Sequence, residues 1–156
     1  MFELEQAQTV ARPGFYLRVS PSGFAAHMSA SPAHLRLVRT LAESALCGAG
    51  VSAGTAANVQ LVASELIGNS VRACGRHVPL VVEVEAEEDG VSVKVHDPEP
   101  GLLPSRRPVA LDDEEAESGR GLGLVDILAP GWHVLRTPVG KQIVCTLPYA
   151  EGDGHP

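Results

Sequence analysis

The chain has 156 residues, of which 44% are hydrophobic and 20% are charged, so it is long enough to fold as one domain with a substantial core. Its 19 acidic and 12 basic side chains leave a net charge of −7, which disfavours direct binding to nucleic acid or to an anionic membrane surface. No apolar run approaches the roughly 20 residues that a membrane-spanning helix requires.

The first half of the chain predicts two helices behind a short strand. Residues 1–14 are expected to be a loose lead-in, residues 15–19 a strand, and residues 24–28 an ambiguous segment or a short edge strand. Ser31 and Pro32 are a typical helix start, a hydroxyl cap followed by proline, so we predict a helix over residues 32–46. Ser52 or Thr55 caps a second helix over residues 56–73.

The second half predicts a sheet that is interrupted by a polar loop. Residues 80–86 and 91–97 alternate between apolar and polar and are joined by a turn at residues 88–90, which indicates a hairpin. Residues 102–118 are rich in proline and then in acid, which favours a mobile loop or lid. A short helix over residues 122–128 and strands over residues 132–137 and 141–147 follow.

These elements predict one domain over residues 1–156, with loose termini at residues 1–14 and 148–156. Strands with one apolar face need helices with matching apolar stripes to cover that face. The predicted fold class is therefore α/β (α+β), a two-layer sandwich in which a mixed, mostly antiparallel sheet carries helices on one face.

Three polar residues follow one edge of the second helix. Glu65, Asn69 and Arg72 are spaced at i, i+4 and i+7 beside the apolar stripe of this helix. Oxygen ligands one turn apart suit a partly hydrated Mg²⁺ ion. An ordinary solvated helix face, or an ion pair between Glu65 and Arg72, is the alternative interpretation.

Two further motifs are candidates for ligand binding. Asp97 ends a strand just before a segment with two prolines, so its carboxylate either forms a turn or accepts a hydrogen bond from a ligand. Gly119, Gly121 and Gly123 alternate directly before an apolar run. A glycine-rich turn that opens a helix favours anion binding, whereas a plain flexible loop before a core helix is the alternative.

The cysteines and the N-terminal residues bear on localisation. Cys47, Cys74 and Cys145 are odd in number and widely spaced, which favours reduced core thiols over disulfides or a zinc site. The first residues have neither the basic nor the apolar part of a secretion signal. We therefore expect a cytoplasmic protein.

Taken in order, the motifs resemble those of the GHKL ATPases, whose fold is also called the Bergerat fold, and most closely the small anti-sigma-factor serine kinases. Residues 61–72 resemble the N-box of this family, and residues 93–97 with Gly101 resemble its G1 box. The segment Ser118-Gly-Arg-Gly-Leu-Gly-Leu124 resembles the G2 box, and residues 140–144 weakly resemble the final box. The resemblance covers residues 30–148.

The resemblance implies ATP and Mg²⁺ as cofactors and a role for each motif. It implies that Glu65 polarises the attacking water or hydroxyl, that Asn69 binds Mg²⁺, and that Asp97 accepts a hydrogen bond from the adenine amino group. It also implies an ATP lid over residues 104–120, with phosphate held by the N–H groups of the glycines. The further nucleotide-binding residues that it implies are Arg72, Gly101, Ser118, Gly119, Arg120, Gly121, Leu122, Gly123 and Leu124.

The resemblance leaves three functions open. The first is a serine/threonine protein kinase that phosphorylates or sequesters a small protein partner, such as a sigma factor or an anti-anti-sigma-like protein; a homodimer is compatible with it. The second is a nucleotide-dependent interaction switch without catalysis, which remains open because Glu99 and Gln142 differ from the residues usual in this family. The third is a protein of this fold that binds no nucleotide.

Overall fold

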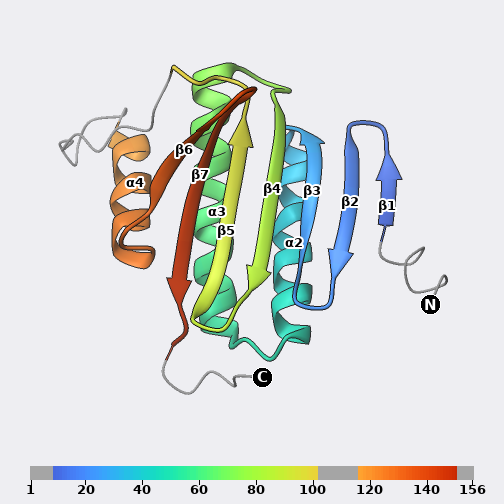
Figure 1. Ribbon diagram of the computed structural model, residues 1–156, viewed down its shortest axis with the longest axis vertical. Coiled ribbons are helices and arrows are strands. Elements are labelled where there is room, and N and C mark those ends of the chain that lie inside the picture. Colours follow the sequence, from blue (N-terminus) through green and yellow to red (C-terminus); the bar gives the residue numbers. More distant parts are fainter. Residues whose placement is uncertain (1–8, 102–115, 151–156) are drawn as a thin grey trace.

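The computed structural model describes residues 9–101 and 116–150, and the side chains of residues 13–101 and 122–150. One sheet of seven strands is built in the order β1-β2-β3-β4-β5-β7-β6, and every neighbouring pair is antiparallel (Figure 1). The strands are β1 (Thr9–Arg12), β2 (Phe15–Ser20), β3 (Gly23–Ser29), β4 (Pro79–Ala86), β5 (Gly90–Asp97), β6 (His133–Thr137) and β7 (Gly140–Pro148).

Within the described residues, three helices, α2 (Pro32–Gly48), α3 (Ala53–Cys74) and α4 (Ala116–Leu128), lie on one side of this sheet (Figure 1). Helix α3 is the central one and contacts α2, α4, β5 and β7. The two-layer α+β sandwich predicted from the sequence is confirmed, and the described part of the sheet is wholly antiparallel rather than mixed.

The core lies between the covered face of the sheet and the apolar stripes of the helices. Alternate residues of the central strands point into it because successive side chains of a strand face opposite sides of a sheet. The buried residues include Val82 and Val84 of β4, Val91, Val93 and Val95 of β5, Ile143, Cys145 and Leu147 of β7, and Val59, Val62, Ala63 and Leu66 of α3.

Both long helices begin at a serine cap. Ser31 Oγ accepts a hydrogen bond from the backbone N–H of His34 at 3.1 Å, and Ser52 Oγ accepts one from the N–H of Thr55 at 3.2 Å. Such caps stabilise a helix by about 1 kcal/mol because they satisfy donors that have no partner inside the helix. The predicted start of α2 is confirmed, and Ser52, not Thr55, caps α3.

The N-terminal part of the sheet is larger than the sequence indicated. Residues 9–12, expected within a loose lead-in, form strand β1, and β3 lies inside the sheet instead of at its edge. Gly23 allows the close pairing of β3 with β4, since a Cβ atom there would lie 1.9 Å from the carbonyl oxygen of Val84.

The helices were also compared with the requirements of a membrane span. Among the described residues, none of them combines the length and the hydropathy that such a span needs.

Helix α4 begins at Ala116, six residues earlier than predicted. Gly119, Gly121 and Gly123 therefore lie inside a helix and not in a turn that precedes one, so the predicted conformation of this segment was wrong. Glycine can adopt helical backbone angles at a cost of about 1 kcal/mol relative to alanine, and alternating glycines alone do not exclude a helix.

Candidate functional site

The candidate site lies where the end of β5 meets the C-terminal part of α3, at the top of the sheet in Figure 1. Asp97, the last residue of β5, shares the covered face of the sheet with Val91, Val93 and Val95, and it is 1% exposed. A buried carboxylate is costly unless it is paired and hydrogen-bonded. The partners of Asp97 therefore define the site.

Three donors from three different segments hold the Asp97 carboxylate. Ser70 of α3 donates from Oγ to Oδ2 at 2.8 Å. Lys141 of β7 donates from Nζ to Oδ1 at 2.9 Å, and the backbone N–H of Glu99 donates to the same oxygen at 3.0 Å. The carboxylate is thus fixed by the helix, by the neighbouring strand and by the segment that follows it.

Lys141 is a site residue that the sequence reasoning missed. Its side chain is 2% exposed, and its Nζ also donates to the backbone carbonyl of Glu99 at 2.7 Å. The sequence pattern could have indicated its burial. Lys141 alternates along β7 with the same spacing as the buried Ile143, Cys145 and Leu147, so its side chain faces the same side of the sheet. A lysine on the core face of a strand requires a buried acid nearby.

The structure places Gln142 away from this site. Gln142 points to the uncovered face of the sheet, where its Nε2 donates to a carboxylate oxygen of Glu83 at 3.3 Å. Its difference from the residue usual in the family therefore does not bear on Asp97. The Glu99 side chain turns back on its own segment, since its Oε1 accepts from the N–H of Gly101 at 2.9 Å.

The predicted metal-binding edge of α3 lies next to Ser70. Asn69 Oδ1 accepts a hydrogen bond from Arg72 at 2.6 Å, whereas Asn69 Nδ2 is buried and finds no partner within the part of the chain that the structure describes. Glu65 is half-buried one turn earlier, and the ion pair found among the described residues joins Lys141 to Asp97, not Glu65 to Arg72. Arg72 therefore pairs with Asn69, not with Glu65.

The glycine-rich segment is described only in part. Ser118, Gly119, Arg120 and Gly121 lie in the first half of α4, but their side chains, and residues 104–115 of the lid predicted over 104–120, fall outside the described residues. Leu122 is buried in the core, Leu124 is half-buried and Gly123 is exposed. Helix α4 contacts α3, which carries Asn69 and Ser70.

The three cysteines have different surroundings, and all are free. Cys74 ends α3 and is half-buried; burial raises the pKa of its thiol, the negative charge of Asp97 raises it further, and Lys141 partly opposes this. Burial raises the pKa of Cys145 to about 12. Cys47 is exposed, so the expectation of core thiols holds for Cys145 and fails for Cys47.

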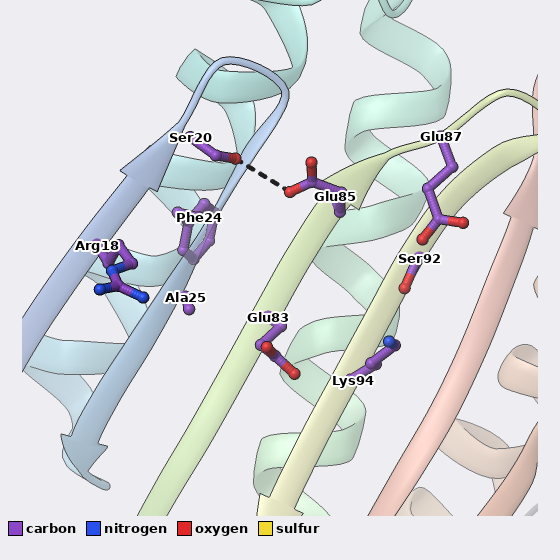
Figure 2. Close-up of a pocket in the computed structure, with 9 residues that line it drawn as sticks. All are labelled: Arg18, Ser20, Phe24, Ala25, Glu83, Glu85, Glu87, Ser92 and Lys94. Atoms are coloured by element: carbon purple, nitrogen blue, oxygen red, sulfur yellow. Dashed lines mark hydrogen bonds between the residues drawn. The ribbon is translucent and has the colours of Figure 1, made fainter. Parts of the chain in front are cut away.

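A separate hollow lies on the uncovered face of the sheet (Figure 2). It includes the glutamates at positions 83, 85 and 87, and Ser20 Oγ donates to Glu85 at 3.1 Å. Arg18 and Lys94 also line it, so its three carboxylates and two cations leave a net charge of −1, which does not favour a triphosphate. The Asp97 site is therefore the better candidate for a nucleotide.

Comparison with known families shows to which family the fold belongs. The family model of the histidine kinase-like ATPase domain matches residues 28–147, which begin in β3 and end in β7. The chain belongs to this family. Membership implies ATP binding and agrees with the resemblance to GHKL ATPases drawn from the motifs. No curated protein matches the chain.

Proposed function

We propose that this chain is an ATP-binding regulatory protein of the anti-sigma-factor serine kinase type, which phosphorylates or sequesters a small protein partner. The observation that carries the proposal is the state of Asp97. A carboxylate has about four acceptor positions, and the described donors fill three of them, two on Oδ1 and one on Oδ2. One acceptor position on Oδ2 is left for a ligand.

This remaining position suits adenine better than guanine. The adenine amino group donates hydrogen bonds, whereas guanine presents a carbonyl oxygen at the same place on its ring. An ionised carboxylate accepts from the first and repels the second. The buried ammonium of Lys141 lies 2.9 Å from Oδ1 and pairs with the carboxylate on the side away from this position.

The phosphate end of the nucleotide is expected near Asn69. An amide nitrogen that is buried without a partner costs about 1–3 kcal/mol, so its position on α3 fits a site that a ligand completes. A phosphate oxygen would accept from Asn69 Nδ2, and Asn69 Oδ1 is the group suited to Mg²⁺. Mg²⁺, when bound with ATP, neutralises the charge of the phosphates.

Glu65 is the proposed general base. It lies one turn before Asn69 on α3, so a hydroxyl or water that approaches phosphate held near Asn69 comes within its reach. Replacing Glu65 with Gln should lower phosphoryl transfer by roughly 10²–10⁴-fold and leave ATP affinity nearly unchanged. A loss of ATP affinity in equal proportion would assign Glu65 to binding instead.

One observation favours the second candidate function, a nucleotide-dependent switch without catalysis. The oxygen that Mg²⁺ would use, Asn69 Oδ1, is held by Arg72 at 2.6 Å. A protein that keeps this bond when ATP is bound would lack the metal ligand that transfer requires. Binding without transfer to water or to any protein partner would support the switch.

Calorimetry with Mg-ATP and Mg-GTP tests the proposed function directly. We expect saturable ATP binding with a clear preference for ATP, because only adenine matches the free acceptor of Asp97. Absence of ATP binding would refute both candidates and favour a protein of this fold that acts only through protein contacts.

A further inference from the structure

Lys141 is buried to a degree that is unusual for lysine. It is the largest side chain among the fully buried residues in the described ranges. Lysine is almost never fully buried unless it is paired, and a buried ion pair seldom stabilises a fold more than apolar residues of the same volume. Fold stability alone therefore does not explain the pair that Lys141 forms with Asp97.

The position of Lys141 determines which carboxylate oxygen is free. Its Nζ and the N–H of Glu99 both donate to Asp97 Oδ1, at 2.9 Å and 3.0 Å. Ser70 is the only described donor to Oδ2. Since each carboxylate oxygen accepts about two hydrogen bonds, a ligand is directed to Oδ2.

Lys141 also fixes the segment that follows Asp97. Its Nζ donates to the carbonyl of Glu99 at 2.7 Å, and Arg136, its cross-strand neighbour on β6, donates to the carbonyl of Pro100 at 2.5 Å. Two cationic side chains of the β6–β7 hairpin thus bind the backbone carbonyl groups of two consecutive residues. The backbone beside the carboxylate cannot rotate without breaking both contacts.

We propose that Lys141 is a positioning residue for purine recognition, which holds Oδ1 of the Asp97 carboxylate and so leaves Oδ2 for the base. The inference rests on the proposed function, since it explains how an ATP site distinguishes adenine from guanine. Without the ammonium group, the buried carboxylate loses its charged partner on Oδ1 and is free to turn away from the base. The fixed orientation of Oδ2 is then lost.

The test compares Lys141→Met with Lys94→Met, a matched change on the uncovered face of β5. Calorimetry is carried out on the full chain with the Mg²⁺ complexes of ATP, GTP and tripolyphosphate. We expect Lys141→Met to weaken ATP binding by about tenfold or more and to bring the ratio of ATP affinity to GTP affinity close to one. The affinity for tripolyphosphate should stay within about twofold of the wild-type value. Lys94→Met should change none of these.

A purely structural role for Lys141 predicts a different pattern, because it would weaken all three ligands equally or leave all of them unchanged. A folded Lys141→Met protein that keeps its ATP-to-GTP ratio overturns the inference. If wild type itself fails to bind ATP, the proposed function has failed. If wild type prefers ATP and Lys141→Met does also, only the role of Lys141 has failed.

A second comparison decides the case if Lys141→Met does not fold. Asp97→Asn is compared with the double variant Asp97→Asn/Lys141→Met, in which neither charge is left buried and unpaired. If Lys141 acts through Asp97, the double variant should bind ATP within about twofold of Asp97→Asn, as expected for two residues of one unit. A further large loss would show that Lys141 acts independently, which contradicts the inference.

Discussion

Replacing Gly140 tests how closely the β6–β7 hairpin packs against the backbone at the end of β5. Its backbone has φ +148°, and a Cβ atom added to it would lie 1.9 Å from the carbonyl oxygen of Asp97 and 2.7 Å from Pro98 Cα. Both contacts are with backbone, so no side chain can move aside. The hairpin and the end of β5 would have to separate by about 1.5 Å to reach ordinary contact distance.

Replacing Gly140 with Ala should therefore lower the free energy of unfolding by about 2–6 kcal/mol. About 1–3 kcal/mol comes from a backbone conformation that is almost restricted to glycine, and overpacking contributes a similar amount. The separation also moves Lys141, the next residue, away from Asp97, so ATP affinity should fall as well. The expected change in Tm is a decrease of roughly 4–24 °C for a chain of this size.

Urea unfolding followed by the fluorescence of Trp132 measures this effect. Trp132 is the chain's single tryptophan, and it is buried next to β6 with its Nε1 bonded to Asp126. Gly131→Ala is the matched control, because φ there is +87° but the added Cβ would meet no atom within 4 Å. It isolates the backbone strain. If Gly140→Ala is no more destabilising than Gly131→Ala, the argument from steric contact is wrong.

Two further predictions follow from the cysteines and from the Asn69–Arg72 contact. In the native protein, Cys47 should be the first cysteine to react with a maleimide. Cys74 should react slowly at neutral pH and faster as the pH rises towards its raised pKa. Cys145 should not react. Mass spectrometry reads out this order, and rapid labelling of Cys145 would refute its burial. Arg72→Ala should strengthen the Mg²⁺ dependence of ATP binding by freeing Asn69 Oδ1, whereas Asn69→Ala should abolish it; calorimetry with and without EDTA distinguishes these outcomes.

The sheet and the two long helices could be predicted from the sequence because each buries one regular face. The alternation of β4 and β5 and the stripe of α3 required a sheet with one covered face, and Ser31 and Pro32 located the start of α2. Strand β1 could not be predicted, because an edge strand gains its stability from backbone pairing with β2 and not from a pattern of its own.

The candidate site was predictable at Asp97 and less so around it. The strand end and the two prolines identified Asp97, but Ser70 and Lys141 reach it only through the register of β5 with β7 and the packing of α3. The difference at Gln142 does not affect the site, because Gln142 follows Lys141 in β7 and neighbouring side chains of a strand lie on opposite faces of a sheet. The helical conformation of the three glycines could not be predicted, because alternating glycines are compatible with a turn as well as with a helix.

The central claim, that Asp97 reads the base of a bound ATP, is tested most directly by comparing wild type with Asp97→Asn in calorimetric titrations with Mg-ATP and Mg-GTP. Asparagine keeps the shape of the side chain but replaces one acceptor oxygen by a donor and removes the charge that Lys141 faces. The account predicts that wild type prefers ATP, and that Asp97→Asn weakens ATP binding by about 1–3 kcal/mol and loses the preference. Equal affinity of wild type for ATP and GTP, or an unchanged preference in Asp97→Asn, would contradict it.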